Sequence, residues 1–252
     1  MHVRTAGHGS RKLLWIHGLG ESGHCFRDIV SHPLLATCTH LVPDLVGYGK
    51  TPAEGEPRSL PEHADELAAA LGGWGIDGAV DVVGHSMGAI VALELGERHP
   101  ALVRSVLDVE GNKTPGDCGY SGLAAPQELG AFLESGYAAL VADIERRFTD
   151  PAHRGYVHSL RLADPATFHL NSTELVEASR GGQLAARLAA LPLPHLYVPG
   201  VDAPGGAPAA SHDAVRAQGV TIRAVGPSGH WPFIDAADDF ASLVSAWLRE
   251  VG

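Results

Sequence analysis

The sequence predicts an α/β fold, with a doubly wound, mostly parallel sheet that carries a helical lid insertion. Short apolar runs alternate with stretches of helical character, and this alternation is typical of parallel strands covered by helices on both faces. A serine flanked by glycines separates one apolar run from the helix-like run after it. Between residues 112 and 191 the alternation stops, which indicates an insertion longer than a simple crossover connection.

The first part of the chain is expected to contain four strands and at least two helices. The strands are predicted at residues 12–16, 39–43, 79–83 and 102–109. A helix is predicted at 60–71, where Gly72 and Gly73 would end it, and another after the second glycine of the serine motif. Residues 25–30 are a further candidate helix start.

The rest of the chain predicts the insertion and the return to the sheet. Helical pieces are expected within the insertion at 126–140 and 173–190, and strands follow at 195–198 and 220–225. A loop is expected at 200–208 and an amphipathic helix at 238–251. The predicted domains are therefore a core of residues 1–111 and 192–252 and a lid of residues 112–191, placed over the carboxyl ends of the strands.

Composition excludes several function classes. The formal net charge is −11 and no cluster of Lys and Arg stands out, so nucleic acid is not an expected partner. No run approaches the roughly 20 apolar residues of a membrane span, and the first residues do not resemble a signal peptide, so a cytoplasmic protein is expected. The three cysteines, Cys25, Cys38 and Cys118, are too sparse for a disulfide framework. The oligomeric state stays open.

The segment from Gly84 to Gly88 reads G-x-S-x-G and carries the strongest chemical signal. It lies between an expected strand and an expected helix, which is the context of a nucleophile elbow. Glycines flank the serine because so tight a turn leaves no room for Cβ atoms. The amides and dipole of the helix N-terminus would favour negative charge near the Ser86 hydroxyl. A glycine-rich turn without chemistry is the alternative interpretation.

A serine nucleophile needs a base, and His230 is the best placed of the 15 histidines. It follows the last expected strand and precedes the last helix, so a parallel sheet would bring it to the edge that carries Ser86. His17 and His85 lie beside glycine loops at the same edge and are expected to hold backbone there. His24 is either a residue of the pocket or a surface residue.

The imidazole in turn needs a carboxylate, and two candidates compete. Glu110 follows the strand at 102–109, and Asp202 follows the strand at 195–198. Both are expected at the carboxyl edge, and strand alternation does not decide between them. Asp108 lies inside its strand and is discounted.

A tetrahedral intermediate needs two N–H donors for its oxyanion. The amide of Met87, directly after the serine, is one expected donor. The second is expected from the glycine loop after the first strand, at the amide of Leu19.

Four motifs, in this order along the sequence, make the chain resemble the α/β-hydrolase superfamily. The resemblance rests on His17-Gly18-Leu19-Gly20, on the loop from Asp44 to Thr51, on the G-x-S-x-G segment and on Gly229-His230. It covers the chain from the first strand to the last helix except for the lid. It is specific for the fold and much less so for the substrate.

The resemblance implies a Ser86 nucleophile, a His230 base and an oxyanion hole at Leu19 and Met87, with no cofactor or metal. Most members take their acid from a Gly-x-x-Asp pattern at the position of Asp202, but here Gly200 precedes it by one residue too few. A minority, similar to the zearalenone lactone hydrolases, carry a glutamate after the preceding strand, which favours Glu110 here. Substrate contacts are expected from Trp231 and His24, and further candidate pocket residues are Phe26, Tyr120, Phe132, Phe148 and His169.

These observations predict a serine hydrolase that cleaves a small carboxylic ester or lactone through an acyl-enzyme. The same groups support carbon–carbon bond hydrolysis or acyl transfer, because the residues of the lid set the selectivity. A small-molecule receptor or regulator with the same fold is a third possibility.

Overall fold

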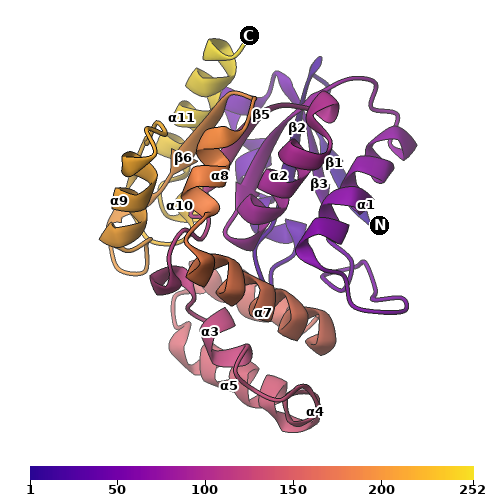
Figure 1. Cartoon of the computed structure of the whole chain (residues 1–252). Helices are drawn as coiled ribbons and strands as arrows, with labels where there is room; N and C mark the ends of the chain where they lie inside the picture. The colour runs from indigo at the N-terminus through magenta and orange to yellow at the C-terminus, as the bar shows by residue number, and fades with distance from the viewer.

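Six strands form the central sheet of the computed structural model, which describes residues 1–252 (Figure 1). Their order is β1-β3-β2-β4-β5-β6; β1 is antiparallel to β3, and the other neighbours are parallel. The expected α/β fold with a mostly parallel sheet is therefore confirmed. The strands are β1 (Val3–Ala6), β2 (Arg11–Ile16), β3 (Cys38–Pro43), β4 (Val80–His85), β5 (Val103–Val109) and β6 (His195–Val198).

Helices cover both faces of the sheet. On β2, Leu14 and Ile16 pack into the cluster that contains the apolar residues of α1 (Leu60–Gly73) and α2 (Met87–Arg98). Their neighbours Leu13 and Trp15 pack on the other side, against α11 (Ala237–Glu250). Successive strand residues point to opposite faces, so an uninterrupted apolar strand supplies two cores. The helices predicted at 60–71 and 238–251 are α1 and α11, and α1 continues through both glycines.

The chain after β6 differs from the prediction. Residues 220–225 were expected to form a strand, but only Ile222 makes an isolated bridge, to Tyr197. The strand is instead β8 (Val225–Ser228), which pairs with β7 (Gly200–Asp202) in a separate two-stranded sheet. The apolar run has β propensity, but the available pairing partner decides where a strand forms. α9 (Ala209–Ala217) connects β7 to this region, and α10 (Pro232–Asp235) follows β8.

Two further differences lie near the N-terminus. The antiparallel edge strand β1 was not predicted, because four residues carry too little periodicity to be recognised. The candidate helix at 25–30 is replaced by short 3-10 turns at Gly23–Phe26 and Ile29–Ser31. These turns place Phe26 against Trp15 in the sheet core, with ring centroids 5.3 Å apart.

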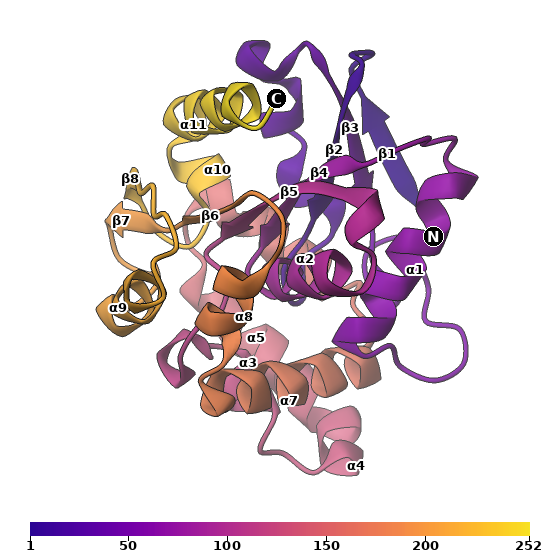
Figure 2. The same cartoon turned by 45° about the horizontal axis from the view of Figure 1, so that its top comes forward.

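Helices without strands fill the chain between β5 and β6. Figures 1 and 2 show α3, α4, α5 and α7 grouped at one end of the sheet. The helical piece expected at 173–190 is two helices, because Gly182 adopts a left-handed conformation (φ 66°) between α7 and α8. α8 packs on α2, where Arg187 lies 2.6 Å from Glu94. The helices are α3 (Ser121–Ala124), α4 (Leu129–Ala131), α5 (Tyr137–Arg147), α6 (Arg154–Leu160), α7 (Pro165–Gly181) and α8 (Leu184–Ala190).

Candidate active site

Ser86 is the single residue between the end of β4 and the start of α2. Its backbone has φ 53° and ψ −118°, a conformation that L-residues rarely adopt. The flanking glycines are required by packing. A Cβ atom on Gly84 would lie 2.4 Å from the carbonyl oxygen of Gly88, and one on Gly88 would lie 2.2 Å from that of Ile16. The sequence G-x-S-x-G thus follows from the close passage of α2 over the ends of β2 and β4.

Ser86 and His230 line one cavity of about 450 Å³. Ser86 comes from the end of β4 and His230 from the loop between β8 and α10. The opposite wall is formed by the helices inserted between β5 and β6, including Tyr120 and Tyr156. The insertion therefore covers the carboxyl ends of the strands, and the cavity lies between it and the sheet.

His230 is in contact with Glu110. Its Nδ1 lies 3.0 Å from one carboxylate oxygen of Glu110, and the other oxygen accepts a hydrogen bond from the Gly200 amide at 2.6 Å. Glu110 is only 2% exposed and, like Ser86, has a positive φ of 53°. With both oxygens held, the carboxylate has one orientation toward the imidazole.

The turn that carries Glu110 is held by the buried ion pair between Lys113 and Asp108. The Lys113 Nζ lies 2.7 Å from Asp108 and donates to the carbonyl oxygens of Gly111 and Asn112. Asp108 also accepts from the Gly111 amide at 3.1 Å. Asp108, which was discounted from the sequence, thus shapes the loop and does not contact His230.

Asp202, the alternative carboxylate, is not brought to the site. It lies at the end of β7 with an exposed side chain, and it does not line the cavity. β7 pairs with β8 beside the His230 loop, so Asp202 is near in the backbone, but its side chain is exposed. Glu110 is the carboxylate in contact with His230. The signal in the sequence was the spacing, because one residue separates Gly200 from Asp202 where the Gly-x-x-Asp pattern has two.

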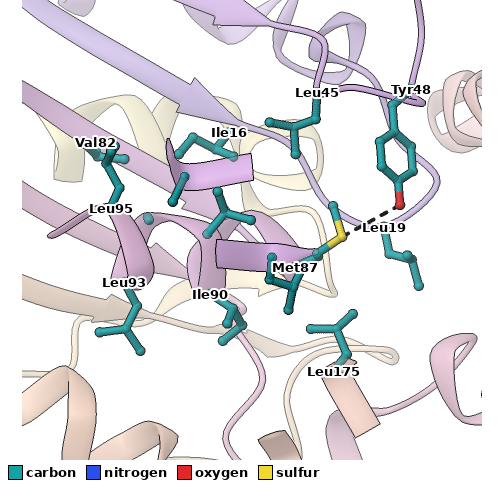
Figure 3. Packing of buried hydrophobic residues seen from close by; sticks show 14 of the residues in the cluster. Ile16, Leu19, Leu45, Tyr48, Val82, Met87, Ile90, Leu93, Leu95 and Leu175 are labelled. Atoms are coloured by element: carbon teal, nitrogen blue, oxygen red, sulfur yellow. Dashed lines mark hydrogen bonds between the residues drawn. The ribbon is translucent and has the colours of Figure 1, made fainter. Parts of the chain in front are cut away.

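The two expected oxyanion donors lie at the ends of neighbouring elements. Leu19 lines the cavity, and its amide makes no hydrogen bond to the backbone. Met87 is the first residue of α2, where an amide has no partner within the helix. Figure 3 shows the Met87 side chain turned toward Tyr48, whose hydroxyl lies 3.9 Å from its sulfur. The Met87 side chain is fully buried and does not line the cavity, so its backbone amide is the part of the residue that can serve the site.

The sequence pattern of the Alpha/beta hydrolase family matches residues 13–243. The chain belongs to this family. Among curated relatives, a pimeloyl-[acyl-carrier protein] methyl ester esterase of Neisseria meningitidis is 38% identical over 133 residues, which are 51% of this chain and 48% of the relative. The lipase LipV of Mycobacterium tuberculosis is 35% identical over 108 residues, which are 42% of this chain and 40% of the lipase. The match thus spans about half of these relatives or less.

Solved structures of alpha/beta hydrolases share the fold over nearly the whole chain. The N-acyl homoserine lactonase AidH with N-butanoyl homoserine superposes with a TM-score of 0.77 at 22% identity, covering 99% of this chain and 92% of the lactonase. A thermophilic esterase from Thermogutta terrifontis gives a TM-score of 0.77 at 17% identity, covering 99% and 93%. At such low identity these likenesses establish the fold only.

A buried pair, Glu21 and His85, supports the site of this alpha/beta hydrolase from below. Glu21 accepts hydrogen bonds from the Gly18 amide at 2.6 Å, from Trp231 Nε1 at 2.5 Å and from His85 Nδ1 at 2.9 Å. The Nε2 of His85 lies 2.7 Å from the carbonyl oxygen of His230. Both nitrogens of His85 face acceptors, so both donate and the ring is cationic.

The charges of this pair stabilise each other. Burial lowers the pKa of His85, but the Glu21 carboxylate and the hydrogen bonds outweigh burial, so the net shift is upward. Burial raises the pKa of Glu21, yet the His85 charge and three donors bring it down to about 2. His85 was predicted to hold backbone and does so. Glu21 was not predicted, since a single glutamate in a glycine loop carries no pattern.

The other predicted residues divide into two groups. Trp231, Tyr120 and Phe148 line the cavity. His24 does not; it is exposed, with its Nε2 3.0 Å from Arg27. His17 is structural, as expected, because its Nε2 accepts from the Leu45 amide at 3.1 Å.

Three further candidate pocket residues of this alpha/beta hydrolase do not line the cavity. Phe26 lies in the sheet core, and Phe132 packs against Phe168 inside the insertion. The Nε2 of His169 lies 2.8 Å from the Gln127 carbonyl oxygen. Tyr156, which does line the cavity, was not predicted, because helical periodicity in an insertion does not show which face meets the site.

No group of three or more histidine, cysteine, aspartate or glutamate side chains is arranged to hold a metal ion. No helix has both the length and the apolar character that crossing a membrane requires.

Proposed function

We propose that this alpha/beta hydrolase cleaves a small carboxylic ester or lactone through a serine acyl-enzyme. The observation that carries the proposal is the contact between His230 Nδ1 and Glu110, 3.0 Å long, at the cavity that Ser86 also lines. A carboxylate on Nδ1 fixes the tautomer in which Nε2 is a free base. His230 and the neighbouring Trp231 both line this cavity.

In the proposed reaction the Ser86 oxygen attacks the substrate carbonyl while its proton passes to His230. Glu110 stabilises the imidazolium that forms. The amides of Leu19 and Met87 donate to the developing oxyanion, and collapse of the intermediate releases the alcohol, which takes the proton from His230. Water, deprotonated by His230, then attacks the acyl-enzyme and releases the acid with regeneration of Ser86. Atoms and charges balance without a cofactor.

The named relatives support an ester or lactone as substrate. The aligned curated relatives are named a methyl ester esterase and a lipase, and similar folds belong to a homoserine lactonase and an esterase. The cavity is lined by no lysine or arginine, while the carboxylates of Glu21, Glu110 and Asp117 reach it. A neutral substrate therefore fits better than one with a free carboxylate near the scissile bond.

The test compares Ser86→Ala with wild type on p-nitrophenyl acetate and butyrate. We expect the variant to lose at least about 10⁴-fold in kcat, the scale seen when a serine nucleophile is removed. Ser31→Ala is the matched control, because Ser31 is exposed on a short turn. Equal turnover by Ser86→Ala and wild type would reject the proposal. A folded variant is verified by an unchanged circular dichroism spectrum.

A further inference from the structure

The hydroxyl of Tyr156 makes no hydrogen bond within the protein and belongs to a side chain at the cavity wall. The residue, on α6, is only 8% exposed and lines the same cavity as Ser86. Of the other buried tyrosines, Tyr48 donates to Asn171 at 2.8 Å and Tyr137 to the Leu160 carbonyl at 2.5 Å, whereas Tyr197 lacks a partner and does not line the cavity. A hydroxyl that no protein group engages and that lies at a cavity wall is available to donate to a bound ligand.

The hydroxyl lies over the loop that presents the Leu19 amide. A Cβ atom built on Gly20 would be 3.3 Å from the Tyr156 oxygen. The helix α6 is tied to the same loop, since the hydroxyl oxygens of Ser159 and Ser22 are 2.9 Å apart. The position of Tyr156 relative to the predicted oxyanion donor is therefore fixed by direct contact between the two segments.

The ring of Tyr156 is held on three sides by other aromatic rings. Its centroid lies 5.6 Å from that of Trp231, 5.5 Å from Phe148 and 5.9 Å from Tyr120. These contacts hold the ring in one orientation at the cavity wall. Burial also raises the pKa of Tyr156 well above its ordinary value, so the group keeps its proton and remains a donor.

We propose that the Tyr156 hydroxyl donates a third hydrogen bond to the substrate oxygen that becomes negative in the transition state, beside the amides of Leu19 and Met87. The proposal rests on the proposed function. The proton stays on Tyr156 throughout, and no bond to the tyrosine forms or breaks. A donor of this kind comes from the insertion, so the insertion completes the site electrostatically and not only by shape.

The experiment replaces Tyr156 by phenylalanine and measures kcat and KM on p-nitrophenyl butyrate. We expect kcat to fall about 10- to 100-fold, as for one hydrogen bond to a charged oxygen, with KM changed less than about threefold. The rate at which diethyl p-nitrophenyl phosphate, a neutral phosphoryl probe, labels Ser86 should fall in parallel. The melting temperature should stay close to that of wild type, because the hydroxyl makes no hydrogen bond within the protein.

The matched control is Tyr137→Phe. Tyr137 gives up a structural hydrogen bond to Leu160 and does not line the cavity. This variant should lose stability while kcat stays within about threefold of wild type. Unchanged kcat in Tyr156→Phe would overturn the inference, and so would a rise in KM alone, which would indicate ground-state binding.

Failure of the inference and failure of the proposed function give different results. If Ser86→Ala is inactive and Tyr156→Phe is fully active, the serine mechanism stands and the third donor is wrong. If Ser86→Ala remains active, the proposed function is wrong and the inference falls with it. A loss of melting temperature in Tyr156→Phe equal to that in Tyr137→Phe would mean that Tyr156 is structural.

Discussion

Ser86 and Glu110 share an unusual backbone and a common support. Both have φ of 53° without being glycine, a strained conformation that persists only where neighbours impose it. The Ser86 amide donates to the Val109 carbonyl at 2.8 Å, and the Glu110 amide donates to that of Val198 at 3.1 Å. Each residue is thus held by the end of the next strand, so the sheet itself sets the spacing of these two groups.

Exchanging each carboxylate for its amide tests which acid serves His230. Glu110→Gln should lower kcat by about 10³- to 10⁴-fold, because an amide at Nδ1 no longer fixes the basic tautomer. Asp202→Asn, the matched control, should stay within about twofold of wild type, since Asp202 is exposed and outside the cavity. Steady-state kinetics on p-nitrophenyl butyrate give both values. The reverse ranking would transfer the role to Asp202.

Part of the site is encoded locally and part is not. Ser86 and His230 lie in short motifs whose glycines are required by the backbone, so the sequence alone identified them as candidates. The choice between Glu110 and Asp202 depends on which side chain is directed toward the imidazole, and only the packed structure decides this. Glu21 and Tyr156 were missed for the same reason, because only the packed structure brings their polar atoms to the cavity.

At the level of elements, the Glu21–His85 pair connects three loops that carry the site. Glu21 lies after β2, His85 ends β4, and Trp231 and His230 follow β8. The hydrogen bonds of the pair reach the indole nitrogen of Trp231 and the carbonyl oxygen of His230. His85 is cationic only while Glu21 is ionised beside it. The relative positions of these three loops therefore depend on a buried charge pair.

Replacing Glu21 by Gln should destabilise the protein in a pH-dependent way. The pKa of His85 is raised from 6.5, so its contribution is complete below 6.5 and is lost as pH rises through the raised value. The pKa of Glu21 is lowered from 4.5 to about 2, so its contribution is present above 4.5 and is lost as pH falls toward 2. The stability difference between wild type and variant is therefore largest between 4.5 and 6.5.

Urea unfolding at pH 3, 5.5 and 9 measures this difference. We expect Glu21→Gln to cost about 3 kcal/mol at pH 5.5, as for a broken buried pair, and less at the other two values. Glu54→Gln is the matched control, because Glu54 is exposed in a loop. A cost that does not vary with pH would mean that the pair is not charged.

The elements that the sequence located well are those with strong periodicity or apolar runs. The strands of the sheet centre and the helices α1 and α11 were found with nearly correct bounds. The strand predicted at 220–225 was wrong, since Val225 onward pairs with β7 and the residues before it make a single bridge. Edge pairing of this kind depends on the partner strand, and local propensity does not contain that information.

On the scale of the whole molecule, the insertion and the sheet share one core. Phe132, Tyr137 and Phe168 of the insertion belong to the same buried cluster as Met87 and Ile90 of α2. Buried hydrogen bonds also join the two parts, since Asn171 of α7 contacts Tyr48 and His63. The helices over the site are therefore expected to unfold together with the sheet, and the cavity to be preformed.

Phe168→Ala tests this cooperativity. Phe168 is fully buried in α7, and its removal should cost about 3–5 kcal/mol, which corresponds to roughly 10 °C in the melting temperature of a chain this long. Leu162→Ala is the control within the insertion; Leu162 is 62% exposed, and its loss should cost less than about 0.5 kcal/mol. Calorimetry should show a single transition for wild type and both variants, displaced as a whole in Phe168→Ala. Two resolved transitions, with only the earlier one shifted, would show that the insertion is a separate folding unit, because a perturbation confined to it would then leave the sheet untouched.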